Sequence, residues 1–196
     1  MTIVMQLLKN TQAWALALLL TFTATSKAEL LFSSDGKAIT IIGRNFVNGR
    51  LIIPNTIRGL PVTSIGANAF EVTGSGLTWV TIPNSVTSIG ERAFYGCTGL
   101  TWVVIPNSVK SIGANAFSVC TGLKGVTIGN SVKSIGEGAF SYSYLTSVYF
   151  MGNAPTVGPN VFSAIGNNVT VYYIAGKTGW GASFAGRPTA LWSIPR

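Results

Sequence analysis

The chain has 196 residues, of which 47% are hydrophobic and only 9% are charged, and its formal net charge is +8 at pH 7. This length corresponds to a single domain. The sequence contains no histidine, so the side chain that most often serves as a general base or a metal ligand near neutral pH is absent. The positive charges are scattered along the sequence rather than gathered in one segment, which argues against a nucleic-acid-binding surface.

The first 28 residues have the composition of an export signal. An apolar run, Ala13 to Leu20, follows the charge of Lys9, and the small residues Ser26 and Ala28 stand at the −3 and −1 positions of a cleavage site. The apolar run is shorter than the ~20 residues that a membrane-spanning helix needs. We therefore expect residues 1–28 to be a cleaved signal peptide, which predicts a secreted or cell-surface protein with no membrane span after cleavage. The alternative is an uncleaved N-terminal anchor.

Residues 29–50 come next and do not match the pattern of the later sequence, so we expect them to form an N-terminal cap. Within this cap the sequence predicts a strand near Ala38–Ile42. End units of a repeat protein commonly depart from the pattern of the inner units.

A seven-residue motif that begins Ser-Ile-Gly and ends Ala-Phe then recurs at intervals of 24, 23 and 23 residues. Its four copies are Ser64–Phe70, Ser88–Phe94, Ser111–Phe117 and Ser134–Phe140. A period between 20 and 50 residues is the signature of a solenoid built from stacked units. We expect residues 51–173 to form about five repeats of 22–24 residues, with Val157–Phe162 as a weaker copy of the motif.

Each repeat also contains a short segment with apolar residues at alternating positions, which predicts a strand. The copies are Leu77–Pro83, Leu100–Pro106, Leu123–Gly129 and Leu145–Phe150. Side chains alternate along a strand, so Val103 and Ile105 should point into the core and Val104 outward. A proline or glycine then ends the strand. The Ile and Phe of the recurring motif should return to the core, and its glycine should take a conformation that a Cβ would penalise.

Residues 174–196 follow the last predicted strand, and we expect them to form a C-terminal cap. Trp180, Phe184 and Trp192 lie in this segment and should cover the exposed end of the core.

The repeat unit Leu-x-x-Val-x-Ile-Pro-Asn-Ser-Val-x-Ser-Ile-Gly-x-x-Ala-Phe-x-x-Cys-Thr-Gly-Leu resembles the BspA-type leucine-rich repeat, over about residues 38–173. The resemblance implies a short, curved, right-handed coil rich in β-structure and poor in helices. It also implies a secreted or surface-displayed protein that binds proteins or extracellular matrix, for example in adhesion. The family shares no catalytic residues, so the resemblance implies neither an enzymatic activity nor a cofactor.

The sequence itself offers little for catalysis or for a metal. Glu91 and Glu137 occupy the same repeat position, but they should lie about 10 Å apart, beyond the ~6.5–9.5 Å of an inverting glycosidase pair. Both should also lie on a solvated convex surface. We therefore predict no catalytic residues and no metal site.

Two cysteines, Cys97 and Cys120, occupy equivalent positions in neighbouring repeats. In an exported protein such a pair can form a disulfide, and neighbouring coils would bring their Cα atoms within the permitted distance. Alternatively, both cysteines face inward as small buried residues, as in the family that the repeat resembles.

The outward positions of the predicted strands carry the strongest candidates for binding. Trp79 and Trp102 should stack beside each other at the edge of the strand face, and the same face should present Thr81, Val104, Thr127 and Tyr149. Trp and Tyr dominate binding hot spots. This face predicts a scaffold that binds a protein or matrix partner. Two alternatives remain open: a module that binds polysaccharide on the Trp pair, and a structural protein that associates with itself.

Overall fold

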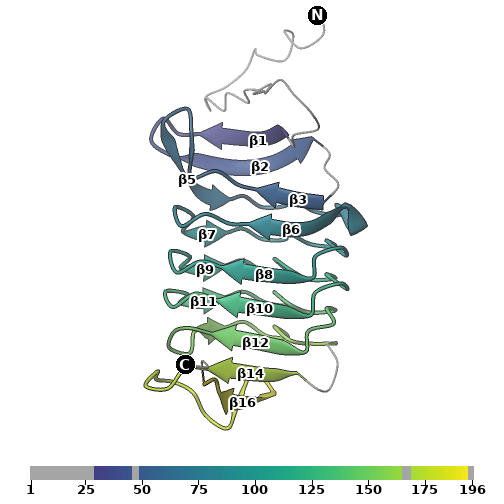
Figure 1. Cartoon of the computed structure of the whole chain (residues 1–196), viewed down its shortest axis with the longest axis vertical. Helices are drawn as coiled ribbons and strands as arrows, with labels where there is room; N and C mark the ends of the chain where they lie inside the picture. Colours follow the sequence, from purple (N-terminus) through teal and green to yellow (C-terminus); the bar gives the residue numbers. More distant parts are fainter. Residues whose placement is uncertain (1–28, 46–48, 165–168, 194–196) are drawn as a thin grey trace, which may run out of the picture.

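The computed structural model describes residues 29–45, 49–164 and 169–193, which wind into an elongated coil with β1 (Glu29–Ser34) at one end and β16 (Arg187–Leu191) at the other (Figure 1). The predicted signal peptide lies outside the described residues. Most turns of the coil contribute one longer and one very short strand, on two sheets that run along its length. The predicted β-rich solenoid is therefore confirmed.

The strands fall into three groups. The long-strand sheet contains, in spatial order, β15 (Ser183–Phe184), β16, β14 (Thr170–Tyr173), β12 (Ser147–Phe150), β10 (Gly125–Ile128) and β8 (Trp102–Ile105). The short-strand sheet contains β1, β2 (Ile39–Asn45), β5 (Leu60–Ile65), β7 (Ser88–Ile89), β9 (Ser111–Ile112), β11 (Ser134–Ile135) and β13 (Thr156–Val157), with β4 (Thr56–Ile57) paired to β5. β3 (Gly49–Ile52) and β6 (Leu77–Thr81) form a separate pair.

Helical structure is almost absent from the described part of the chain, where it is limited to one 3-10 turn, η1 (Gly74–Gly76). Among these residues no helix has the length and apolar character needed to cross a bilayer.

The sheet register places equivalent residues of successive repeats side by side. In the long-strand sheet Val126 pairs with Val103 on one side and with Val148 on the other. As predicted, Val103 and Ile105 are buried, whereas Val104 is 47% exposed. Each outward position therefore belongs to a column of side chains that runs along the coil axis.

The phenylalanines of the recurring motif form a continuous stack inside the coil. The rings of Phe70, Phe94, Phe117, Phe140 and Phe162 are buried, and successive ring centroids lie 5.1, 5.0, 5.4 and 5.9 Å apart. Phe162 belongs to the weak copy of the motif, so that copy contributes a genuine unit of the core. The stack links the turns of the coil into one hydrophobic core.

The glycine of the Ser-Ile-Gly motif is required by the close approach of neighbouring turns. The prediction that a Cβ would be penalised here is confirmed, but not because of a left-handed backbone, since Gly90, Gly113 and Gly136 have no positive φ. A Cβ on Gly113 would instead lie 2.5 Å from the backbone nitrogen of Glu91 in the preceding turn.

The N-terminal segment begins with an antiparallel hairpin of β1 and β2. The sequence predicts only the second strand, and it predicts it near Ala38–Ile42 rather than at Ile39–Asn45. Asp35 closes the hairpin, because its Oδ1 accepts hydrogen bonds from the backbone N–H of Lys37 and of Ala38, each at 2.8 Å. These hydrogen bonds lower the pKa of Asp35.

The C-terminal segment continues the ladder as well as covering the core. β16 pairs in parallel with β14 and so adds a further strand to the long-strand sheet. Trp180 and Phe184 lie over the end of the core, with ring centroids 4.9 and 5.4 Å from that of Phe150. Trp192 stands on the outer face instead, 4.9 Å from Tyr149 between centroids, so its predicted place over the core is wrong.

The long strands do not form one continuous sheet. β6 pairs with β3 and β8 pairs with β10, but no ladder joins β6 to β8 in the described part of the chain. Pro106 follows β8 and has no N–H to donate to the preceding turn. The equivalent Gly129 does donate, to the carbonyl oxygen of Ile105 at 2.9 Å. Pro83 holds the equivalent position after β6, and β6 still pairs with β3, so the missing donor at Pro106 does not by itself explain the break.

Candidate binding face

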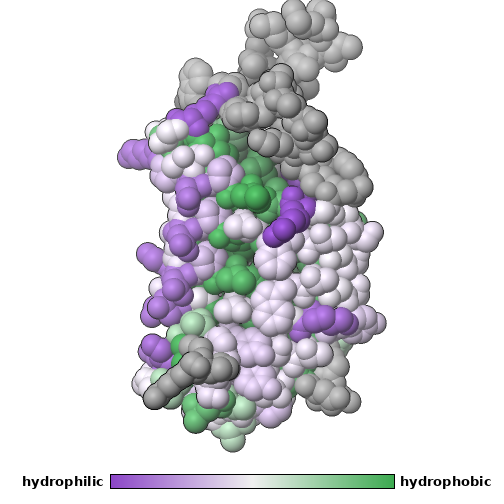
Figure 2. All heavy atoms as spheres, viewed as in Figure 1, coloured by the Kyte–Doolittle hydropathy of each residue, from purple (hydrophilic) through white to green (hydrophobic). Residues whose placement is uncertain are grey.

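The six residues predicted to form a ligand-binding face lie on the outward side of four long strands. Trp79 and Thr81 are on β6, Trp102 and Val104 on β8, Thr127 on β10 and Tyr149 on β12. Val104, Thr127 and Tyr149 are aligned by the register of the sheet. Viewed from the same side as Figure 1, hydrophobic atoms form a stripe along the coil, with hydrophilic side chains along one edge (Figure 2).

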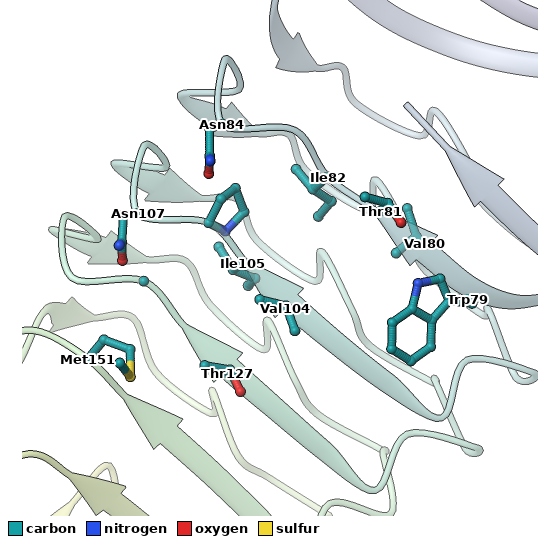
Figure 3. A pocket seen from close by; sticks show the side chains of 12 residues that line it. Trp79, Val80, Thr81, Ile82, Asn84, Val104, Ile105, Asn107, Thr127 and Met151 are labelled. Atoms are coloured by element: carbon teal, nitrogen blue, oxygen red, sulfur yellow. The ribbon is translucent and has the colours of Figure 1, made fainter. Parts of the chain in front are cut away.

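A depression opens on this face where the ladder is broken between β6 and β8 (Figure 3). Its volume is about 380 Å³, within the range of small-molecule sites. Four of the six predicted residues line it, namely Trp79, Thr81, Val104 and Thr127. Further lining comes from the turns that follow the strands, including Asn84 and Asn107. None of the twelve residues that line it is charged.

Trp79 is held from one side by a cation. The guanidinium of Arg50 on β3 lies over the indole, with its carbon 5.5 Å from the ring centroid. Such a contact stabilises both groups. Trp79 stands at one end of the depression, whereas Asn84 and Asn107 stand at the other (Figure 3).

The predicted stacking of Trp79 on Trp102 is wrong. Among the described aromatic side chains these two rings make no contact. Trp102 leans away from Trp79, over Gly125 of the next turn, where the missing side chain leaves room for the indole. Its ring centroid lies 5.9 Å from that of Tyr149.

Trp102 belongs instead to an aromatic cluster formed with Tyr149, Tyr172 and Trp192. Tyr149 stacks on Tyr172 with centroids 5.0 Å apart, and it also meets the edge of Trp192 at 4.9 Å. All four side chains are partly exposed. The cluster covers the outer face from β8 to the segment after β16.

Several residues of this face are missed by the sequence analysis. Tyr172 lies 23 residues after Tyr149, and Asn107 lies 23 after Asn84, so the repeat period itself is the signal that could have found them. Ile52, which is 71% exposed and pairs with Thr81, extends the same column. Trp192 gives no such signal, because its place depends on the additional strand β16.

The remaining charged residues of the described part of the chain are not grouped in a way that suggests a catalytic or metal site. Glu91 and Glu137 are exposed, as expected for a solvated surface. Arg92 forms an ion pair with Glu71 and lies over the ring of Tyr95. No group of His, Cys, Asp and Glu side chains suitable for a metal ion occurs in the described part of the chain.

Cys97 and Cys120 are present as free, fully buried thiols and not as a disulfide. Each thiol donates to a carbonyl oxygen of the preceding turn, Cys97 to Phe70 at 3.3 Å and Cys120 to Phe94 at 3.1 Å. Hydrogen bonding with the Cys97 thiol, together with burial, raises the pKa of Cys120 well above its ordinary value. Cys120 therefore remains a neutral thiol near pH 7.

The comparison with protein families decides the classification, because six copies of the BspA type leucine rich repeat region match residues 53–179. The chain belongs to this family. The match contains one copy more than the five repeats counted in the sequence. Membership of the BspA-type family suggests a protein-interaction scaffold, and members of such families are typically not enzymes. Among curated proteins there is no significant match.

Solved structures of other bacterial leucine-rich repeat proteins resemble this BspA-type chain. A leucine-rich repeat protein of T. pallidum is 28% identical, with a TM-score of 0.67 over 73% of this chain and 68% of that protein. One from Bacteroides ovatus is 25% identical, with a TM-score of 0.63 over 87% of this chain and 46% of that one. The chain thus spans less than half of the Bacteroides protein. The pneumococcal vaccine antigen PcpA, at 19% identity and a TM-score of 0.55 over 82% of this chain and 51% of that one, shares the fold alone.

Proposed function

We propose that the chain is a non-enzymatic scaffold that binds a protein partner, such as a component of the extracellular matrix, through the outer face of its long strands. The aromatic cluster of Trp102, Tyr149, Tyr172 and Trp192 carries this proposal. Trp and Tyr supply large contact areas at low entropic cost, and they are enriched at the energetic centres of protein interfaces.

The surroundings of the cluster support the same function. Val104 and Ile52 expose apolar surface in the column that leads to it. Lys124, beside β10, is exposed and lies over the ring of Tyr144, 5.1 Å from the centroid, so a charged residue borders the face. An apolar and aromatic centre with a polar rim is the usual composition of a protein interface.

We further propose that the protein acts outside the cell or at its surface. This proposal rests on the predicted signal peptide of residues 1–28 and on the family to which the chain belongs. A carbohydrate module built on a Trp79–Trp102 pair is not supported, because the two indoles are not together.

The proposal is tested by measuring the binding of the full chain to immobilised matrix proteins by surface plasmon resonance. The double variant Trp102→Ala/Tyr149→Ala removes the centre of the cluster. Truncation of one hot-spot aromatic costs about 2 kcal/mol or more, so the double variant should weaken binding by at least tenfold.

Tyr142→Ala is the matched control, since Tyr142 is an exposed aromatic residue that belongs neither to the cluster nor to the depression. It should bind as the unaltered chain does. Equal binding by the double variant, once its melting temperature shows that it is folded, would place the partner site elsewhere. Self-association without binding of any matrix protein would favour the structural role.

A further inference from the structure

The depression between β6 and β8 has a composition unlike that of the aromatic cluster. It contains one aromatic ring, the hydroxyls of Thr81 and Thr127 and the carboxamides of Asn84 and Asn107, and none of the residues that line it is charged. The other side chains that line it are apolar, namely Val80, Ile82, Val104, Ile105, Pro106 and Met151. The site thus offers a largely apolar surface, one aromatic platform and several neutral hydrogen-bonding groups. It therefore suits a neutral ligand that carries many hydroxyls on a partly apolar frame.

The Trp79 indole is held in place before a ligand binds. Arg50 covers one side of the Trp79 indole, and Trp79 contributes to the wall of the depression, so the ring is held before any ligand arrives. An immobilised aromatic ring loses little conformational entropy on binding. The C–H face of a pyranose ring can stack on such an indole, as apolar ligand surfaces do on aromatic platforms.

At the opposite end of the depression, the carboxamides of Asn84 and Asn107 offer hydrogen-bond donors. Oδ1 of Asn107 accepts the backbone N–H of Asn130 at 2.9 Å, which fixes the orientation of the carboxamide. No hydrogen bond within the described residues engages Nδ2 of Asn107 or the carboxamide of Asn84, so these groups are free to bind a ligand. Figure 3 shows both side chains on successive turns at the same end of the depression.

The distance between the two ends sets the size of the ligand. Asn84 lies five positions after Trp79 along a largely extended chain, or roughly 16 Å at about 3.3 Å per residue. A single sugar ring is too short to reach both ends. We propose that the depression binds a short, neutral oligosaccharide laid along β6 and β8, with one ring on Trp79 and the hydroxyls of another on Asn84 and Asn107.

This site is separate from the proposed protein-binding cluster, because Trp102, Tyr149, Tyr172 and Trp192 do not line the depression. The two proposals can therefore fail independently. The oligosaccharide site rests on β6, β8 and their turns, with Thr127 of β10 and the contact of Arg50 with Trp79.

The test is isothermal titration of the full chain with cello-, manno-, xylo- and chito-oligosaccharides of two to four units. A hyaluronan tetrasaccharide serves as the acidic comparison and a proline-rich peptide as the protein comparison. We expect at least one neutral oligosaccharide to bind, and its affinity to fall at least tenfold in Trp79→Ala. Asn107→Asp keeps the size of the side chain but removes its donors, so it should also weaken binding.

Tyr142→Ala should leave oligosaccharide binding unchanged, and so should Trp102→Ala/Tyr149→Ala. Nuclear magnetic resonance then locates the site, since the ligand should shift the indole N–H of Trp79 and the side-chain NH₂ of Asn84 and Asn107. The proposal is overturned if no neutral oligosaccharide binds, if only the acidic sugar or the peptide binds, or if Trp79→Ala binds with unchanged affinity.

Discussion

The glycine that follows each Ser-Ile pair shows how a single atom can limit the spacing of the coil. At Gly113 a Cβ would meet the nitrogen of Glu91 and the carbonyl carbon of Gly90, both at 2.5 Å. Both atoms belong to the backbone of the preceding turn and cannot rotate away. The side-chain-free position therefore allows neighbouring turns to approach until their hydrogen bonds form.

Gly113→Ala should accordingly destabilise the protein by about 1–3 kcal/mol, the usual cost of forcing extra atoms into a packed interior. Chemical denaturation monitored by circular dichroism measures this loss. Gly181→Ala is the matched control, because Gly181 also lacks a positive φ and its added Cβ would find only the carbonyl oxygen of Ser183, at 3.8 Å. This variant should stay within about 0.5 kcal/mol of the unaltered protein. Equal stability of the two variants would contradict the packing argument.

The two cysteines give a second prediction at this scale. Because Cys97 and Cys120 are both fully buried, neither thiol should react with a thiol reagent in the folded protein. Hydrogen bonding with the Cys120 thiol lowers the pKa of Cys97, so burial alone protects that residue, whereas Cys120 also has a raised pKa. Both should react once the protein is unfolded without a reductant. A count of no reactive thiols in the unfolded protein would show a disulfide and would contradict the free-thiol arrangement.

The phenylalanine stack is the element that connects the turns of the coil. Phe117 stands in its middle, with Phe94 at 5.0 Å on one side and Phe140 at 5.4 Å on the other. Phe117→Ala should lower the free energy of unfolding by about 3–5 kcal/mol, because it leaves a cavity and removes two ring contacts. Thermal and chemical denaturation measure the change.

The control for the Phe117 variant is Tyr142→Ala, which removes an exposed ring from another part of the coil. It should change the stability by less than about 0.5 kcal/mol. A similar loss in both variants would show that ring removal, rather than the interior stack, determines the result.

The elements of the inner repeats are predictable from sequence because each one repeats a local pattern that its neighbours reinforce. The alternation of Val103, Val104 and Ile105 and the return of the phenylalanines to the core follow from periodicity alone. The break between β6 and β8 does not follow from periodicity, because the repeats on its two sides carry the same strand-ending Ile-Pro pair. The position of Trp102 depends on a glycine in the next turn, Gly125. Features set by contacts between different repeats therefore escape a repeat-by-repeat analysis.

The candidate face was predictable to a similar extent. Its six residues were found because outward positions follow from strand alternation. The grouping of these residues into a depression and an aromatic cluster was not predictable, because it arises from the sheet break and from β16. The hairpin strand β1 was not predicted either, because it belongs to no repeat.

At the scale of the whole molecule, the ends of the coil must be covered for the core to stay out of water. Removal of residues 174–196 would uncover Phe150 and take away the strand that pairs with β14. Solenoids need such terminal units for solubility. The shortened chain should melt at a lower temperature and should form larger species as its concentration rises.

Differential scanning calorimetry and light scattering measure these two effects. The control is Lys177→Ala, which changes an exposed residue of the same segment and leaves the cap in place. An unchanged melting temperature in the shortened chain, with a single monomeric species, would show that the cap is dispensable.

The arrangement of β1 and β16 at opposite ends of the coil has a mechanical consequence (Figure 1). Tension applied between these ends runs along the coil axis, and therefore along the hydrogen bonds that join successive strands. Bonds loaded in this direction open one after another rather than all at once. Each turn that unwinds releases 23 residues, or roughly 80 Å of extended chain. A molecule held between two surfaces would thus lengthen step by step under a small force and absorb a sudden pull.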